Sequence, residues 1–472
     1  MSKIDHVVVL MLENRSFDSI LGRLYPDRAE FDGVPQGAHN MFDGQRVDAW
    51  TSDPGDGIGD FTIPTPDPKE DFADMTDQIF GTGKAPPEPA DMSGFAENYA
   101  KTGSNPRNVM HGYTPGQLPV ISTLAKHFAV SDRWFASAPN QTWPNRFFVH
   151  TGTAGGYVNN SPIHPPYMME TIFNRLIQAQ RSWRIYHHDF PQSATLTRIW
   201  SELPDHLYSF EDHFMTDAMS GRLPSYSFIE PRYFPDPLFS RLPNDQHPPH
   251  DVALSERLIA RCYDAIRNGA GWARTLFIIT YDEHGGNWDH VPPPAAISPD
   301  DLRHDGFAFD RYGVRVPAVL VSPWIPAGTI ARAPESGRPF DHTSILSTLR
   351  ALFGPFDPLT KRDAVAPDLL GTLSLPEPSN GGPHNLPIPT PTSDRPRLKA
   401  AGQASATNVH MALAAMAQRL PDGTAKVVEH TEALRASVPA EGVPKAESMS
   451  VGDALKDVKA GLTRLLNGVG LS

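Results

Sequence analysis

Cysteine and long apolar runs are both scarce in this chain of 472 residues. The single cysteine, Cys262, excludes an intramolecular disulfide framework, and its apolar helical surroundings favour a packing role over a reactive thiol. No run approaches the roughly 20 apolar residues that a membrane span requires, so we expect no transmembrane anchor. No basic segment with a cleavage site precedes the first apolar run, so we expect a cytoplasmic protein, or a secreted or periplasmic one if a leader has been removed.

Positive charge is also in deficit. The chain has 41 lysines and arginines against 54 aspartates and glutamates, which gives a formal net charge of -13. An acidic chain repels the phosphates of nucleic acids, so we expect no nucleic-acid partner. An anionic substrate would need a metal ion or a local group of cations to reverse the field. With 39% hydrophobic residues, the chain is long enough for one large core with insertions or for two domains.

Short apolar runs bounded by turn residues predict strands, and amphipathic stretches between them predict helices. This alternation is typical of an α/β fold with a mostly parallel central sheet flanked by helices. Asp251 and Asp341 precede two helical stretches as possible N-terminal caps. The expected strands are 4–12, 183–186, 226–229, 276–281 and 316–321, and the expected helices are 118–128, 252–267 and 343–353.

Two regions depart from the alternation. Residues 26–106 are rich in Gly, Pro and Asp, which predicts a long loop excursion over the active-site face. A Pro-rich stretch at 373–397 predicts an extended linker, so we place the catalytic domain at residues 1–372. Residues 398–472 predict a helical C-terminal extension that packs or forms a homo-oligomer, with amphipathic helices expected at 409–420, 424–436 and 451–466.

Two of the apolar strands run straight into oxygen-bearing side chains. Glu13 and Asn14 follow the first strand, and Asp282 and Glu283 follow the strand at 276–281. Ligands gather at the carboxyl ends of strands in open α/β sheets, so the two pairs could form one cage for a cation. A cage of oxygens suits calcium, magnesium or manganese better than zinc. The alternative is that these polar residues only cap turns.

A hydroxyl held between prolines is the third candidate. Thr142 lies between Pro139 and Pro144, ahead of a helix that we expect to begin near Asn145. If Thr142 lay against a metal ion, its alkoxide would form near neutral pH and could attack phosphorus, and the helix N-terminus would favour the anion. The alternative is a threonine in a surface turn.

Four motifs follow one another along the chain. They are Glu13-Asn14-Arg15-Ser16-Phe17-Asp18, Thr142-x-Pro144-Asn145-Arg146, His247-Pro248-Pro249 and Asp282-Glu283-x-Gly285-Gly286-x-x-Asp289-His290-Val291. In this order they resemble the bacterial phosphoesterase family of phospholipases C and respiratory-burst-inhibiting acid phosphatases, within the alkaline phosphatase superfamily. The resemblance covers roughly residues 4 to 370 and implies an alkaline-phosphatase-like sandwich. It leaves the C-terminal extension unexplained.

The resemblance implies a role for each residue of the cage. Thr142 is then the nucleophile, and Glu13, Asn14, Thr142 and Asp282 bind one divalent metal ion, with Glu283 adjacent. In that arrangement the metal would polarise a phosphoryl oxygen and Thr142 would attack in line. Water would then hydrolyse the phosphothreonine.

Histidines are expected to bind the phosphoryl oxygens and to protonate the leaving alkoxide, because imidazole titrates near working pH. His247 and His290 lie within matching motifs, and we expect both to be catalytic. His187 and His188 follow the strand at 183–186, and similarity in placement alone suggests that they bind substrate. Structural hydrogen bonding is the alternative for all four.

One position departs from the family pattern. Many relatives carry a histidine in an Asp-Pro-x-His-x-Phe-like segment, where this chain has Glu70. If the loop covers the site, Glu70 would disfavour dianionic monoesters and could accommodate a cationic head group or a second cation. A solvated acidic loop residue is the alternative.

These features together predict a metal-dependent hydrolase of phosphoric esters, of the phospholipase C or phosphatase type. Its substrate would be a phosphorylated small molecule or a phospholipid head group. Hydrolysis of sulfate or phosphonate esters is an alternative, because sites of the superfamily accept related tetrahedral anions. A noncatalytic binding or assembly protein on the same fold is a further alternative, which the presence of Thr142 and every proposed ligand disfavours.

Overall fold

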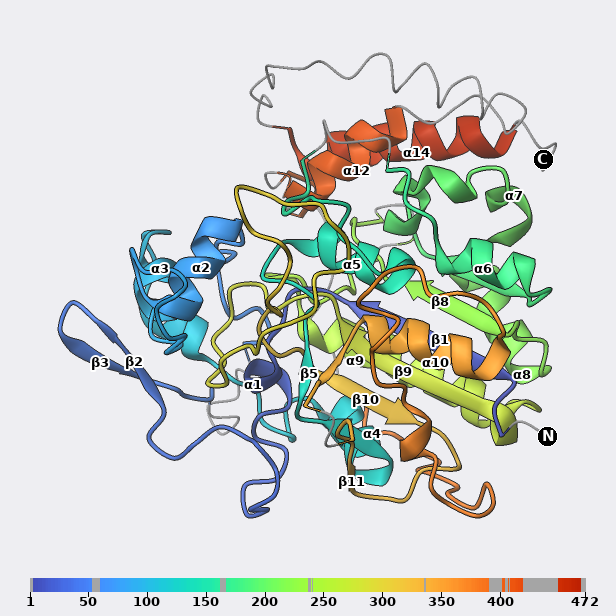
Figure 1. Cartoon of the computed structure of the whole chain (residues 1–472), viewed down its shortest axis with the longest axis horizontal. Helices are drawn as coiled ribbons and strands as arrows, with labels where there is room; N and C mark the ends of the chain where they lie inside the picture. Colours follow the sequence, from blue (N-terminus) through green and yellow to red (C-terminus); the bar gives the residue numbers. More distant parts are fainter. Residues whose placement is uncertain are drawn as a thin grey trace.

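A central sheet organises the computed structural model of this protein (Figure 1). The structure describes residues 3–52, 60–161, 167–236, 239, 241–334, 337–389, 401–403, 406, 408–418 and 449–467. The sheet strands are β1 (His6–Leu12), β4 (Ala129–Ser131), β6 (Trp183–His187), β7 (Leu207–Ser209), β8 (Tyr226–Glu230), β9 (Thr275–Tyr281), β10 (Ala318–Val321) and β11 (Thr329–Ile330). Their order is β11-β4-β10-β9-β1-β8-β6-β7, and only β10 runs antiparallel to its neighbours. This confirms the predicted α/β fold with a mostly parallel sheet.

The register of the central strands decides where the polar residues emerge. β1 pairs with β9 along its whole length, from His6 opposite Thr275 to Leu12 opposite Tyr281. Both strands are almost entirely buried, because helices cover the two faces of the sheet, and this explains their continuous apolar sequences. Since the two carboxyl ends coincide, the residues after Leu12 and Tyr281 meet at one edge. β8 lies on the other side of β1 and ends there too.

Helices cover the sheet in two groups (Figure 1). In the first group α4 and α8 contact α9, α4 contacts β10 and α9 contacts β9. In the second group α5 contacts both α6 and α10. The first group comprises α4 (Pro119–His127), α8 (Met215–Met219) and α9 (Val252–Arg267), and the second α5 (Thr142–Thr151), α6 (Ile172–Gln178) and α10 (Thr343–Phe353).

The two predicted helix caps have different outcomes. The side chain of Asp251 accepts a hydrogen bond from the backbone N–H of Ala253, so the cap of α9 is confirmed. The predicted cap by Asp341 is wrong, because His342 occupies the N-cap position of α10. Asp341 instead accepts hydrogen bonds from the hydroxyls of Ser137 and Thr343.

The excursion at 26–106 has more regular structure than its composition suggests. It holds a hairpin that projects from the body in Figure 1, and two helices that pack against each other. Ile79, Phe95 and Tyr99 belong to a small separate hydrophobic cluster, which also contains Trp288 and Val314. The elements are β2 (His39–Phe42), β3 (Gln45–Asp48), α2 (Phe72–Phe80) and α3 (Phe95–Ala100).

The C-terminal extension contributes helices α12 (Asn408–Gln418) and α14 (Val451–Asn467), which lie side by side in Figure 1. Their buried side chains, among them Leu413 and Leu455, share one hydrophobic cluster with the central sheet. Residues 373–389 carry no helix or strand. The predicted helix at 424–436 and the predicted linker residues 390–397 lie outside the described residues. A homo-oligomer through these helices stays a prediction.

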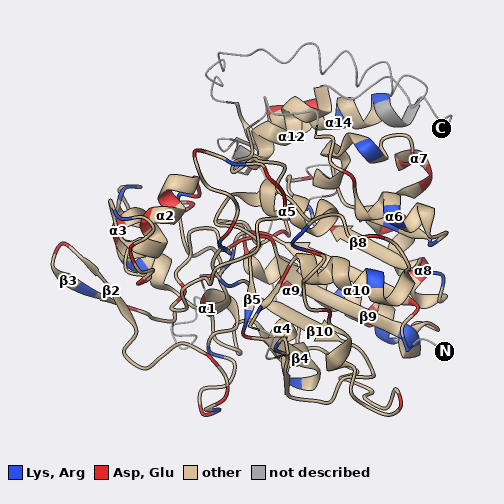
Figure 2. Ribbon diagram, in the orientation of Figure 1, with Lys and Arg blue, Asp and Glu red and all other residues tan. Residues whose placement is uncertain are grey.

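The described helices carry no concentration of one charge and no long apolar run. Figure 2 shows acidic and basic residues interspersed around the periphery, with a further group of both signs near the centre of the view. Within the described part of the chain, no helix is long and apolar enough to cross a membrane.

Candidate active site

The two strand ends bring their polar residues together, as the sequence predicts. Glu13 and Asp282 are fully buried, and the backbone N–H of Asn14 donates to Oδ1 of Asp282 at 2.9 Å. Asn14 holds this position with a φ of 53°, in the left-handed region. Gly285 lies directly against it, since a Cβ there would lie 2.3 Å from the carbonyl oxygen of Asn14. A glycine is therefore required at 285 for the two strand ends to meet.

Thr142 lies at the same edge of the sheet. It is the first residue of α5, so this helix begins three residues before the predicted start at Asn145. Its buried hydroxyl donates to Oδ1 of Asn14 at 3.3 Å. The side-chain amide of Asn145 donates to the carbonyls of Ala138 and Asn140, which fixes the turn before the helix. Thr142 thus contacts Asn14 at the strand ends and also lies at the partial positive charge of a helix N-terminus.

Arg146, one turn further along α5, supplies the positive charge of the site. It is fully buried and pairs with Glu13 at 2.8 Å, Glu230 at 3.2 Å and Asp282 at 3.3 Å. Arg146 was predicted from the sequence only as part of a motif, and Glu230 was not predicted. The sequence does carry a signal for Glu230, because this acidic residue ends the apolar strand β8 much as Glu13 follows β1.

One arginine does not balance the carboxylates. Burial raises the pKa of Glu13 well above its usual range, Asp282 raises it further and Arg146 opposes both. Burial also raises the pKa of Glu283 well above its usual range, and the charges of Glu70 and Asp282 add to this effect. Burial is the main cause of both pKa shifts and the neighbouring carboxylates add to it, so a bound cation would favour the charged forms of both groups.

Two orphaned oxygens show that a cation fits this site. Oε2 of Glu13 and Oε1 of Glu283 are buried and have no hydrogen-bond partner among the described residues. A buried carboxylate oxygen without a partner is costly, and a bound cation removes that cost. Carboxylates, the amide oxygen of Asn14 and the hydroxyl of Thr142 are the oxygen ligands that calcium, magnesium and manganese prefer. The residues present therefore fit a divalent cation.

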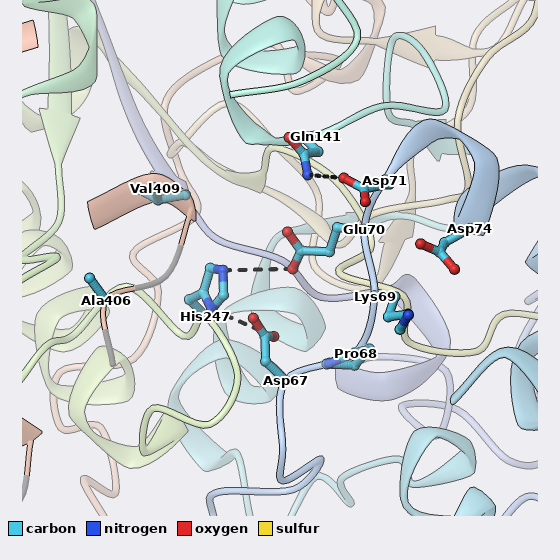
Figure 3. Close-up of a pocket in the computed structure, with 10 residues that line it drawn as sticks. All are labelled: Asp67, Pro68, Lys69, Glu70, Asp71, Asp74, Gln141, His247, Ala406 and Val409. Atoms are coloured by element: carbon cyan, nitrogen blue, oxygen red, sulfur yellow. Dashed lines mark hydrogen bonds and ion pairs between the residues drawn. The ribbon is translucent and has the colours of Figure 1, made fainter. Parts of the chain in front are cut away.

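A cavity of about 300 Å³ lies beside these oxygen ligands and is lined in part by Glu70, Gln141 and His247 (Figure 3). Glu70 is buried, and its Oε1 accepts a hydrogen bond from the side-chain amide of Asn14 at 2.6 Å. The excursion therefore covers the site, and the alternative of a solvated Glu70 is wrong. Burial raises the pKa of Glu70 to about 8, despite the hydrogen bond from Asn14. Burial lowers the pKa of His247 to about 3.

His187 and His188 line a different cavity, of about 170 Å³, between the sheet and α14. Nδ1 of His187 bonds the carbonyl of Asp189 at 2.7 Å, and Nδ1 of His188 bonds the carbonyl of Glu230 at 2.9 Å. Burial lowers the pKa of both imidazoles, that of His188 to about 3. Among the described residues, His188 is therefore linked to the Thr142 site only through Glu230.

His290 bonds two carboxylates through its two ring nitrogens. Its Nδ1 bonds Asp18 at 2.6 Å and its Nε2 bonds Asp32 at 3.1 Å. Burial lowers the pKa of His290, but these two carboxylates outweigh burial and raise it to about 9. With both nitrogens occupied, the ring is a partly buried cation in an ion-pair network, which also contains Arg315.

Comparisons with known proteins identify the family of this chain. A model of the Phosphoesterase family matches residues 4–355. The chain is 39% identical to the non-specific phospholipase C1 of Arabidopsis thaliana, over 76% of this chain and 69% of the relative. It is 29% identical to phospholipase C B of Mycobacterium tuberculosis (strain ATCC 25618 / H37Rv), over 85% of this chain and 82% of the relative.

Among solved structures, a protein in the alkaline phosphatase superfamily from Vibrio parahaemolyticus matches 78% of this chain and 71% of its own. Its sequence identity is 11% and its TM-score is 0.37. The family match spans the sheet, Thr142 and both strand-end pairs, which are the parts that build the site. The chain belongs to the Phosphoesterase family and is a hydrolase of phosphoric esters.

Proposed function

We propose that this enzyme is a metal-dependent, phospholipase C-like phosphodiesterase that acts through a phosphothreonine on Thr142. The observation that carries the proposal is the position of the Thr142 hydroxyl. The hydroxyl lies at a helix N-terminus and donates to Asn14. In the same cluster Glu13 and Glu283 each have a buried carboxylate oxygen without a hydrogen-bond partner among the described residues. The similarity to phospholipases C from a plant and a bacterium supports a diester substrate with a phospholipid head group.

The chain's own residues divide the work of the first step. Glu13, Asn14, Thr142 and Asp282 would hold a divalent cation, which when bound polarises the phosphoryl group and lowers the pKa of the threonine hydroxyl. Oγ1 of Thr142 forms the new bond to phosphorus while the bond from phosphorus to the leaving oxygen breaks, and that oxygen takes up a proton. Arg146 pairs with Glu13 and Asp282 and orients both carboxylates.

The second step returns the enzyme. Water attacks the phosphothreonine from the side that the leaving group vacated, the bond to Oγ1 breaks, and two inversions give net retention at phosphorus. The N-terminal end of α5 favours the anion that develops near Thr142 in both steps. His247 faces the cavity next to Gln141, so we place it beside the leaving oxygen. We assign His290 a structural role, because carboxylates occupy both of its nitrogens.

A pair of threonine variants tests the nucleophile. Thr142 and Thr151 are both buried in α5, and the hydroxyl of Thr151 bonds the carbonyl of Phe147. Thr142→Ala should lower manganese-dependent turnover of an aryl phosphodiester by about a thousandfold or more, since it removes the attacking atom. Thr151→Ala should leave turnover within a few fold. Full metal-dependent turnover by Thr142→Ala would refute the proposal.

The choice between ester classes depends on Glu70. Its carboxyl group lies against Asn14 at the cavity, and in its ionised form without a bound cation it opposes a dianionic monoester more than a monoanionic diester. Rates on matched aryl phosphodiester, phosphomonoester, sulfate and phosphonate substrates rank the classes directly. The diester should have the highest kcat/KM. A monoester or sulfate that exceeds the diester would contradict this specificity.

A further inference from the structure

A second set of potential metal ligands lies beside the group that contains Glu13 and Asp282. Asp67, Glu70 and His247 each offer one ligand atom, and these three atoms lie within 4.8 Å of one another. Asp67 and Glu70 come from the loop before α2, whereas His247 comes from the segment between β8 and α9. Figure 3 shows the imidazole facing both carboxylates across the cavity. Residues far apart in the sequence thus converge on one point.

The orientation of His247 leaves one ring nitrogen facing the cavity and available to a ligand. Its side chain is 4% exposed, and Nδ1 bonds the carbonyl of Pro248 at 2.7 Å, so Nδ1 carries the proton. Nε2 then has a lone pair, which points at Oε1 of Glu70 from 3.6 Å. No described residue donates a hydrogen bond to Nε2. A cation between Nε2 of His247 and Oε1 of Glu70 would bind both atoms. Imidazoles that bind metals are commonly fixed through the other nitrogen in this way.

The carboxylates of Asp67 and Glu70 also face this point of the cavity. Oδ1 of Asp67 is buried, has no hydrogen-bond partner among the described residues, and lies 3.8 Å from Nδ1 of His247. Glu70 has a side chain that is 8% exposed, and it accepts a hydrogen bond from Asn14. Asn14 therefore links the two groups, because its amide oxygen accepts from Thr142 and its amide nitrogen donates to Glu70.

We propose that Asp67, Glu70 and His247 bind a second divalent cation next to the first. Two carboxylates and one imidazole form a ligand set suited to zinc or manganese, and further positions stay open to water or to an ester oxygen. The role of this ion rests on the function proposed above: it would stabilise the leaving oxygen opposite Thr142, as the second ion of a two-metal site does. Its presence depends on Glu70, the position where this chain departs from the family pattern.

Manganese binding followed by electron paramagnetic resonance tests the site without reference to activity. The full chain, treated with chelator and titrated with manganese, should take up two ions, whose signals broaden because neighbouring spins couple. Glu70→Gln keeps the acceptor for Asn14 but removes the charge, and should weaken the second ion about tenfold or more. Asp67→Asn should do the same. Asp74→Asn is the control, since Asp74 lines the same cavity outside the ligand set, and it should leave both ions in place.

The outcomes separate the second site from the proposed function. Uptake of one uncoupled ion by the wild-type chain would overturn the second site, as would variants at Asp67 and Glu70 that bind two coupled ions with unchanged affinity. Zinc at equal concentration should displace the second manganese before the first, and displacement in the opposite order would also overturn it. Full turnover by Thr142→Ala would refute the nucleophile and leave the wild-type ion count as it is.

Discussion

Replacing Arg146 by methionine should destabilise the folded enzyme by about 3–5 kcal/mol, the usual cost of removing one partner from a buried ion pair. The structure puts this residue at the upper end of ion-pair effects, because Glu13, Glu230 and Asp282 all lie within 3.3 Å of its nitrogens. Urea unfolding in the presence of a chelator measures the loss. Arg274→Met is the matched control, since Arg274 pairs with Asp5 at the surface and should change stability by about 1 kcal/mol or less.

Manganese should then stabilise the Arg146 variant more than it stabilises the wild type. The reason is that the guanidinium no longer competes with the ion for Glu13 and Asp282. The reasoning fails if the variant loses less than about 1 kcal/mol in chelator, because three buried carboxylates would then tolerate the loss of their cation. It also fails if manganese stabilises the variant less than the wild type.

Two further predictions concern a pH dependence and a backbone conformation. Asp18 and Asp32 raise the pKa of His290 from 6.5 to about 9, so its contribution to the free energy of unfolding is complete below pH 6.5 and is lost as pH rises through 9. After a discount for partial exposure this contribution amounts to about 2 kcal/mol. The variant His290→Gln should therefore flatten the pH dependence of the urea midpoint over that range. An unchanged pH profile would contradict this ion-pair assignment. Gly285→Ala should lower the free energy of unfolding by about 1–2 kcal/mol, because residue 285 has a φ of 58°. The added Cβ should also displace Asn14, so manganese affinity and kcat should both fall. An unchanged manganese affinity would show that Asn14 is not a ligand.

The sheet and the strand-end residues were predictable because each follows from a local rule. A strand covered on both faces has a continuous apolar sequence, and β1 and β9 both do. The carboxyl ends of parallel strands meet at one edge, so Glu13 and Asp282 could be placed together before any distance was known. The end of a strand is less certain, and for this reason His187 falls inside β6 rather than after it.

The parts that escaped prediction depend on contacts between distant segments. The three partners of Arg146 come from the ends of β1, β8 and β9, and no local pattern encodes that meeting. α2 and α3 are short and are stabilised by packing against each other, so tertiary contacts outweigh their weak local signal. His290 lies in a matching motif, but its direction is set by Asp18 and Asp32, which are more than 250 residues away in the sequence.

Trapping the covalent intermediate tests the central claim most directly. The manganese-loaded enzyme is mixed with an aryl phosphodiester, quenched in acid within the first turnover and digested for mass spectrometry. We predict an adduct on the peptide that contains Thr142, with the phosphoryl group and its retained ester substituent on the threonine oxygen. Thr151, in the same helix, should carry none. Rapid turnover with no adduct on Thr142, or with an adduct on another residue, would contradict the account.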